Sequence, residues 1–336
     1  MAELTESTAR TPIWDNAKGI LVVLVVLGHA IQPAAASGVA FADVLYRSIY
    51  LFHMPAFVLV TGILTAELTQ RRAGRLVTNI AVPYLLFQVF QTIEVSILRG
   101  SFAPLHVLVP RWTLWYLVAV ILWRLSTPLW LALGPWVAVC SALALALLAG
   151  LGTGVGHALA LDDALGFLPF FVIGLLARTR HTDLVRRRTV RVGALAIIIA
   201  AVLAVIATRH AFARSALQLG FATDALHTSA ARGTLLRAAL ITAALVLTVA
   251  VLLLVPRRVT RWGVIGRASL YVYLLHPLVL LPFRHGSWAT DTTRAVLVAL
   301  GAVALAALLA TPPARAMTRW AVEPVWAGRL LSARRV

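Results

Sequence analysis

The residues with the clearest chemical potential are Asp15, Lys18 and His29, which lie together in one strongly apolar stretch, residues 14–33. About 20 apolar residues suffice for a helix to cross a bilayer, and charged groups inside such a helix are costly unless they are paired or face protein. In an α-helix, Lys18 and His29 project from one face, about 16 Å apart along the axis, and Asp15 can pair with Lys18 one turn away. Neutral imidazole is the usual general base near pH 7. We therefore predict that His29 is catalytic, assisted by Lys18 and Asp15.

A simpler interpretation of this stretch is also open. Lys18 is the only lysine in the chain, and it can extend toward the membrane edge without any chemical role. His29 can likewise be a buried histidine with one hydrogen-bond partner. Asn16 is a further polar residue that the helix must satisfy, and we predict that it contributes to substrate binding.

Two more histidines lie in apolar stretches, each just before a proline. His53 precedes Pro55, and His276 directly precedes Pro277. A proline in a membrane helix can free a backbone carbonyl, so a buried histidine bonded to such a carbonyl is the simpler explanation for His53. If successive helices alternate in direction, however, all three histidines fall at a similar depth near the outer face. We therefore predict a shared cavity in which His53 and His276 bind substrate.

Three histidines also raise the question of a metal site. We predict no metal site, because no two of these histidines are four residues apart and no helix supplies a neighbouring carboxylate.

Two other groups of residues are candidates for binding. Trp115 and Tyr116 can line the substrate pocket, whereas Trp112 is expected in the aromatic belt of the membrane interface. Arg72 and Arg75 can clamp donor phosphates through paired hydrogen bonds, or they can serve only as topology signals.

The composition is that of an integral membrane protein. Of the 336 residues, 61% are hydrophobic and 12% are charged, whereas soluble domains carry roughly 25% charged residues. We predict an all-α polytopic fold of about ten transmembrane helices, which need no separate soluble domain. The apolar stretches lie near residues 13–35, 45–68, 76–98, 113–130, 135–151, 162–177, 192–208, 234–255, 262–282 and 293–312.

The placement of the arginines predicts the topology. The net charge of +18 does not indicate nucleic-acid binding, because the arginines lie in short segments between apolar stretches. Alternate segments are arginine-rich, namely 71–75, 178–191, 257–261 and 315–335. By the positive-inside rule these segments are cytoplasmic, so both termini are expected in the cytoplasm and the chain in the plasma membrane. We expect one integral-membrane domain over residues 1–336, with short cytoplasmic tails at 1–12 and 314–336.

These motifs together resemble the acyltransferase type 3 family. The resemblance rests on Lys18-x10-His29, FHMPAFVLVTG at 52–62, LWYL at 114–117 and YVYLLHP at 271–277. Within the family, the sequence WDNAKGILVVLVVLGH at 14–29 most resembles the fucose 4-O-acetylase-like branch. The resemblance implies a membrane bundle that moves an acyl group, acetyl above all, from acyl-CoA to a hydroxyl of a carbohydrate or other cell-envelope acceptor.

The same resemblance implies roles for individual residues. His29 corresponds to the essential histidine, Lys18 to the basic residue of the helix 1 pattern, and Arg72 with Arg75 to a cytoplasmic Arg-x-x-Arg motif. Acyl-CoA is then a donor substrate, and no tightly bound cofactor is expected. The expected partners are the acceptor, the lipid bilayer and a second copy of the chain.

A second class of function is a transporter or flippase of a polar lipid-linked glycan. In that case the His, Lys and Asp side chains inside the membrane would form a proton relay. The sequence shows no inverted repeat and no sign of paired broken helices, which argues against a transporter.

Overall fold

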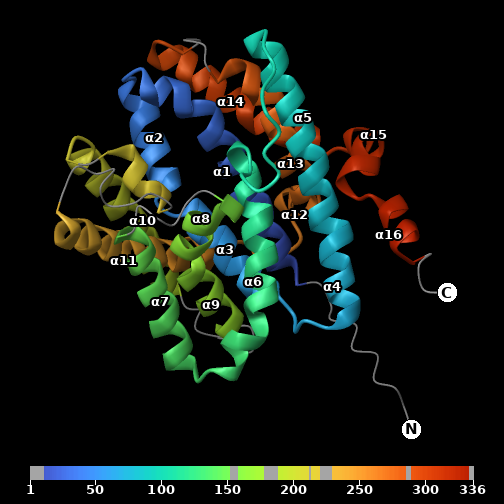
Figure 1. The fold of residues 1–336 in the computed structure, drawn as a ribbon. Coiled ribbons are helices and arrows are strands. Elements are labelled where there is room, and N and C mark those ends of the chain that lie inside the picture. Colours follow the sequence, from blue (N-terminus) through green and yellow to red (C-terminus); the bar gives the residue numbers. More distant parts are fainter. Residues whose placement is uncertain are drawn as a thin grey trace.

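A computed structural model of the chain shows a bundle of helices (Figure 1). The structure describes residues 11–151, 158–177, 188–211, 213–219, 229–284 and 289–332. No strand occurs within these ranges, so the predicted all-α fold is confirmed. The predicted topology signals at 178–187, Arg334 and Arg335 lie outside the described residues.

The helices follow one another along the chain with short connections. The first half holds α1 (Pro12–Ala36), α2 (Ala40–Tyr50), α3 (His53–Leu64), α4 (Gln70–Leu76), the π-helical turn η1 (Val77–Ala81), α5 (Val82–Arg99), the 3₁₀ turn η2 (Trp112–Leu114), α6 (Trp115–Ala132) and α7 (Pro135–Leu151). The second half holds η3 (Ala158–Ala160), α8 (Leu161–Gly166), α9 (Leu168–Ala177), α10 (Arg188–Thr208), η5 (Arg214–Gln218), α11 (Ala230–Leu254), α12 (Arg261–Arg267), α13 (Ser269–Leu280), η7 (Leu281–Phe283), α14 (Thr292–Leu309), α15 (Pro312–Val322) and α16 (Val325–Ser332).

Each predicted apolar stretch contains a helix or a pair of helices. In the described part of the chain, 7 helical stretches are long and apolar enough to cross a membrane, or up to 9 if each of two bent pairs is one span. The remaining stretch is α7, which is apolar but only 17 residues long. A polytopic membrane protein is therefore confirmed, while ten crossings stay a prediction.

Two of these spans are broken, which the sequence did not indicate. The segment Ala158–Gly166 meets α9 at 62°, and α12 meets the segment Ser269–Phe283 at 76°. The expectation that the chain lacks paired broken helices is therefore wrong. The physical reason is local: the first break falls at Phe167, and Pro169, the second residue of α9, cannot donate a hydrogen bond to the Leu165 carbonyl four residues earlier.

Helix α1 occupies the centre of the bundle and packs against α2, α3, α12, α13 and α14 (Figure 1). Its contact with α12 is a backbone-to-backbone approach between glycines. A Cβ atom at Gly19 would lie 2.0 Å from the Trp262 carbonyl oxygen, and one at Gly266 would lie 1.7 Å from the Asp15 carbonyl oxygen. Small residues allow helices in a membrane to approach closely, so this pair sets the distance between α1 and α12.

The second predicted span is interrupted between α2 and α3, at Leu51 and Phe52. The cause is Pro55, which lies in the first turn of α3. A proline cannot donate to the carbonyl four residues earlier, here that of Leu51, and its ring displaces that carbonyl. The interruption places His53 at the first position of α3.

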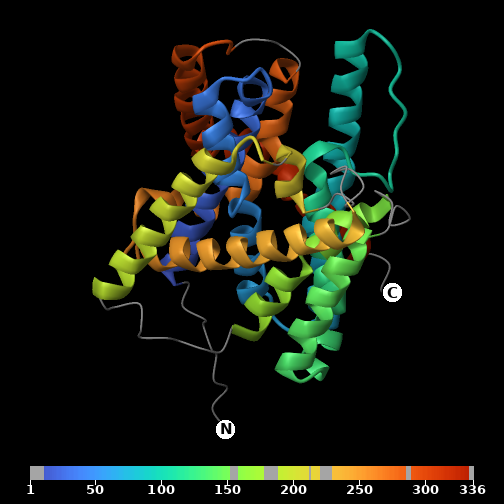
Figure 2. The same cartoon turned by 90° about the vertical axis from the view of Figure 1, so that its left-hand side faces the viewer.

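The remaining helices enclose this centre. Helix α7 stands upright in Figures 1 and 2, whereas α11 lies across it and packs against α3, α7 and α10. The predicted cytoplasmic tail after residue 313 holds most of α15 and all of α16 in the described residues, and α15 packs beside α5 and α13.

Candidate active site

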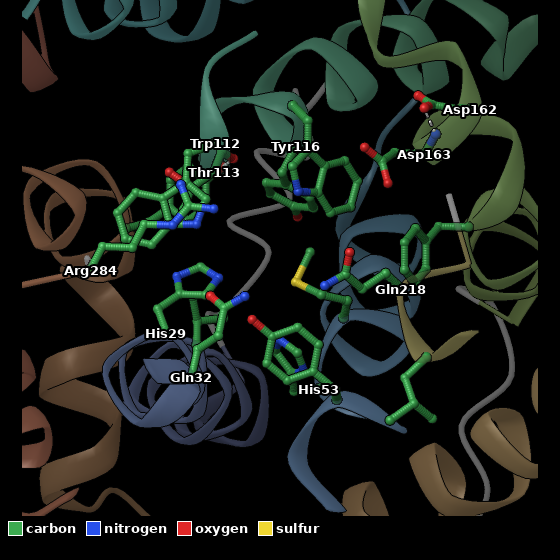
Figure 3. Close-up of a pocket in the computed structure, with 17 residues that line it drawn as sticks. His29, Gln32, His53, Trp112, Thr113, Tyr116, Asp162, Asp163, Gln218 and Arg284 are labelled. Carbon is green, nitrogen blue, oxygen red and sulfur yellow. Dashed lines mark hydrogen bonds between the residues drawn. The ribbon is translucent and has the colours of Figure 1, made fainter. Parts of the chain in front are cut away.

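A cavity of ≈ 210 Å³ lies where α1, α3, α6 and α8 approach one another (Figure 3). His29 and His53 both line it, and His276 lies directly behind His29. The structure thus brings together three histidines from α1, α3 and α13, which are up to 247 residues apart in the sequence. His276 is not among the residues that line the cavity, so the predicted shared cavity holds His29 and His53, and substrate binding by His53 and His276 stays a prediction.

The hydrogen bonds of the histidines determine which nitrogen carries a proton. His276 is fully buried, and its Nδ1 lies 2.9 Å from the Val272 carbonyl oxygen. A carbonyl only accepts, so the Nδ1–H of His276 donates to it, and the Nε2 of a neutral His276 must be an acceptor. The Nδ1 of His29 lies 2.9 Å from that Nε2. His29 therefore donates from Nδ1, which leaves its Nε2 with a free lone pair.

These two hydrogen bonds hold His29 in the form of a general base. The rings of His29 and His276 stack at 5.2 Å between centroids, with an interplanar angle of 16°. One imidazole thus fixes the tautomer and the orientation of the other, as the carboxylate does in a Ser-His-Asp triad. The result is a neutral imidazole whose unprotonated nitrogen belongs to a side chain that lines the cavity.

His53 is both a histidine bonded to a backbone carbonyl and a residue that lines the cavity, the two alternatives that the sequence left open. Its Nδ1 lies 2.9 Å from the Ile49 carbonyl oxygen, close to the interruption between α2 and α3, so it is a buried histidine bonded to a backbone carbonyl. It also lines the cavity and packs edge-to-face against Tyr50. The carbonyl bond again leaves Nε2 unprotonated in the neutral ring.

The aromatic residues that precede and open α6 form one wall of the cavity. Trp115 and Tyr116 both line it, as predicted, and the Tyr116 hydroxyl is hydrogen-bonded to Thr61. Trp112 also lines the cavity, 5.2 Å from His29 between ring centroids, a contact that the sequence did not predict, and its place in the interface belt stays a prediction. Its φ of 40° lies in the left-handed region, a strained conformation of the kind that clusters at functional sites.

Arg284 contributes the positive charge of this wall. Its guanidinium carbon lies 4.8 Å from the centroid of the Trp112 ring, which is a cation–π contact. Burial lowers the pKa of Arg284 from its ordinary value, and Tyr50 acts in the opposite direction. It is the only Lys or Arg among the described residues that line the cavity. Arg284 lies just past the end of a predicted span, so nothing in the sequence indicates its position in the cavity.

The opposite end of α1 holds the other predicted catalytic residues. Lys18 lies 2.9 Å from Asp15, so the predicted pair is confirmed. Asn16 is fully buried: its amide nitrogen donates to the Pro256 and Arg258 carbonyls, and its oxygen accepts from Thr260. None of the three residues of α1 lines the His29 cavity. Asn16 thus anchors the segment before α12, and its predicted role in substrate binding stays a prediction.

A second cavity lies at the other end of α3. It has a volume of ≈ 240 Å³ and is lined by Arg72, Arg75 and Arg124, together with Leu64 and Asn79. Arg124 comes from α6, and its Nε is buried without a hydrogen-bond partner among the described residues. Arg72 donates from Nη1 to the Glu67 carbonyl, 2.8 Å away. Arg124 was not predicted from the sequence, because a lone arginine in an apolar stretch carries no sign of its partners.

The two cavities lie at different levels along the same two helices, α3 and α6. Helix α3 begins at His53 in the first cavity and ends at Leu64 in the second, a separation of about 16 Å at ~1.5 Å per residue. Helix α6 likewise begins with Trp115 in the first cavity and carries Arg124 in the second. In the described chain, no group of three His, Cys, Asp or Glu side chains is placed to hold a metal ion.

Two relatives show similarity to parts of the chain. It is 32% identical over 151 residues to the nodulation protein NolL of Sinorhizobium fredii, which covers 40% of this chain and 41% of that protein. It is 40% identical over 62 residues to the NolL of Mesorhizobium japonicum, or 18% of this chain and 17% of that protein. The chain therefore spans less than half the length of these relatives. No solved structure matches it. Residues 12–311 match the family model described as an acyltransferase domain, and the chain belongs to the acyltransferase type 3 family.

Proposed function

We propose that this membrane protein is an O-acyltransferase, which moves an acetyl group from acetyl-CoA to a hydroxyl of a carbohydrate or other cell-envelope acceptor. The observation that carries the proposal is the series of hydrogen bonds that runs from the Val272 carbonyl through His276 to His29. These bonds leave the Nε2 of His29 unprotonated, and His29 lines a cavity with room for a small acceptor.

In the proposed reaction, the Nε2 of His29 takes the proton of the acceptor hydroxyl while the oxygen attacks the thioester carbonyl. The new C–O bond forms as the C–S bond breaks, and the leaving CoA thiolate receives the proton from the His29 imidazolium. Negative charge develops on the carbonyl oxygen during the attack. Arg284 is the cation in this wall of the cavity, and we assign it to stabilise that charge.

The second cavity supports a binding site for the donor. Three arginines converge there, and guanidinium groups bind phosphate through paired, charge-assisted hydrogen bonds. With acetyl-CoA phosphates held by Arg72, Arg75 and Arg124, the acyl end of the donor extends along α3 and α6 toward His29. We place this cavity on the cytoplasmic side of the plasma membrane and the His29 cavity toward the outer side, with both termini cytoplasmic. Lys18 and Asp15 keep a supporting role near the cytoplasmic end of α1.

A carrier for a polar glycan remains the second candidate, and the two broken spans are the observation that favours it. The purified protein separates the two proposals. An acyltransferase releases CoA thiol from acetyl-CoA slowly without an acceptor, and faster once a hydroxyl acceptor is added. A carrier releases none under either condition, and this result would reject the proposed function. Mass spectrometry of cell-surface glycans with and without the gene then identifies the acceptor.

A further inference from the structure

A third cavity lies between α1, α13 and α14, and we refer to it as the apolar cavity. Its volume of ≈ 420 Å³ is twice that of the His29 cavity and falls within the roughly 300–1,000 Å³ of small-molecule sites. Among the described residues that line it, only His29 and Arg284 have polar side chains. The others are alanine, glycine, valine, leucine, proline or phenylalanine. The cavity therefore suits an apolar group.

The apolar cavity adjoins the site of the proposed chemistry. His29 and Arg284 line both it and the His29 cavity. Figure 3 shows these two side chains on the same edge of the His29 cavity. The His29 cavity is also lined by residues of α3, α6 and α8, whereas no described residue of these helices lines the apolar cavity. The proposed base and the proposed cation thus lie at the boundary between a polar cavity and an apolar one.

Small side chains leave the space of the apolar cavity open where α1 packs against α14. Ala30 and Ala34 of α1 line it, as do Gly301 and Ala302 of α14. Small residues usually let membrane helices approach closely, as the glycines between α1 and α12 do. Gly301 differs from those glycines, because a Cβ atom there would meet no neighbouring atom within 4 Å. The space beside Gly301 is therefore open to a ligand and is not closed by helix packing.

The acyl group of the donor needs a space of its own at His29. During the proposed attack, the thioester carbon carries an oxygen, the attacking hydroxyl, the sulfur of CoA and the acyl chain. The oxygen is assigned to Arg284 and the hydroxyl to His29, while the sulfur belongs to a donor that extends along α3 and α6. The apolar cavity borders the same two residues on the side without α3 and α6. An apolar chain that enters this space leaves water, which is favourable.

We infer that the apolar cavity holds the acyl chain of the donor, and that the preferred donor is an acyl-CoA of medium chain length. Acetyl is then the shortest acyl group that the protein transfers, and a longer one is transferred better. The inference rests on the proposed function and leaves its bonds unchanged: the C–O bond forms, the C–S bond breaks, and the proton passes through His29 to the CoA thiolate. Each methylene buried in the cavity should raise kcat/KM about fourfold until the cavity is full.

The test measures the release of CoA thiol from acetyl-, butyryl-, hexanoyl- and octanoyl-CoA by the full-length protein in phosphatidylcholine nanodiscs. Water is the acceptor, so no tail of an acceptor can occupy the cavity. The wild type should show a kcat/KM for hexanoyl-CoA about tenfold or more above that for acetyl-CoA. Gly301→Phe fills the open space and should lower this hexanoyl-to-acetyl ratio about tenfold. Leu305→Ala enlarges the cavity and should raise the octanoyl-to-hexanoyl ratio.

Gly193→Phe in α10 is the matched control. Gly193 is also an exposed helical glycine whose Cβ atom would meet nothing within 4 Å, and it does not line the apolar cavity, so both ratios should stay at their wild-type values. The inference is overturned if the wild type prefers acetyl-CoA to every longer donor. It is also overturned if Gly301→Phe and Leu305→Ala both keep the wild-type ratios, because the cavity then holds only bilayer lipid. Failure of the proposed function looks different, since the wild type would then release thiol from none of the four CoA esters.

Discussion

At its start α1 carries Asp15, Asn16 and Lys18, and toward its end it carries His29. Burying any of these side chains in a membrane helix costs free energy, yet they have different partners at the two ends of α1. At the start, the amide of Asn16 is used fully by backbone and side-chain groups of the same chain, and Lys18 is paired with Asp15. At the end, the bond from His29 to His276, which is itself bonded to the Val272 carbonyl, leaves the Nε2 of neutral His29 unprotonated. Polar residues thus fix the position of α1 at the Asn16 end and supply a general base at the His29 end.

The comparison implies that substitutions at the two ends differ in kind. Those at the His29 end should reduce turnover without unfolding the protein. Those at the Asn16 end should reduce stability without changing the chemistry. The following predictions test this difference, in order of decreasing effect on the rate.

The largest effect is expected for His29 itself. Both His29→Ala and His29→Gln should lower acyl transfer about 10²–10⁴-fold, because glutamine can hydrogen-bond to His276 but cannot take a proton. The measurement is the initial rate of transfer at matched amounts of protein in the membrane. His106→Gln is the control, since His106 is exposed and does not line the cavity. Near wild-type transfer by His29→Gln would make His29 a packing residue and would remove the basis of the comparison.

His276 should have the next largest effect, as a positioning residue. His276→Ala removes the acceptor for the Nδ1–H of His29 and should lower kcat roughly 10- to 100-fold, the cost of one hydrogen bond to a group that becomes charged. His276→Gln supplies a carbonyl oxygen as an acceptor and should restore part of the loss. Neither variant should change the KM for acetyl-CoA. Equal kcat values for the alanine and glutamine variants would contradict the positioning role.

A smaller and different change is expected at the second cavity. Replacing both Arg72 and Arg75 by glutamine should raise the KM for acetyl-CoA about tenfold or more, because charge-assisted bonds to phosphate are lost. Arg124→Gln should act in the same direction. The control is Arg294→Gln, at an exposed position on α14. If donor affinity is unchanged while the protein still inserts correctly, Arg72 and Arg75 are topology signals only.

The smallest effect on the rate is expected for Asn16. Asn16→Ala leaves the Pro256 and Arg258 carbonyls without their donor, and each lost partner costs about 1–3 kcal/mol of stability. The variant should unfold at a lower temperature in detergent, while kcat at low temperature stays near that of the wild type. Thermal unfolding and transfer rates of the same preparation provide the measurement. A stable Asn16→Ala protein that has lost transfer would place Asn16 in substrate binding after all.

Much of the fold followed from local pattern. Apolar runs of about 20 residues predict membrane helices, because the bilayer demands that length whatever the helices contact. The pair of Lys18 with Asp15 was also predictable, since residues three apart on a helix are neighbours. The meeting of His29, His53 and His276 required one further assumption, namely that successive helices alternate in direction.

What the tertiary structure decided was which polar groups meet. The bond between His29 and His276 and the joining of Arg124 to Arg72 and Arg75 connect segments that are distant in the sequence. Trp112, in the 3₁₀ turn before α6, and Arg284, just after η7, line the same cavity, which hydropathy does not record. The physical reason is that hydrophobic burial is nearly independent of direction, whereas a hydrogen bond requires its donor and acceptor within about 3 Å. Sequence pattern therefore determined that this chain is a helical membrane bundle with buried histidines, and helix packing decided which of their nitrogens remains free to act.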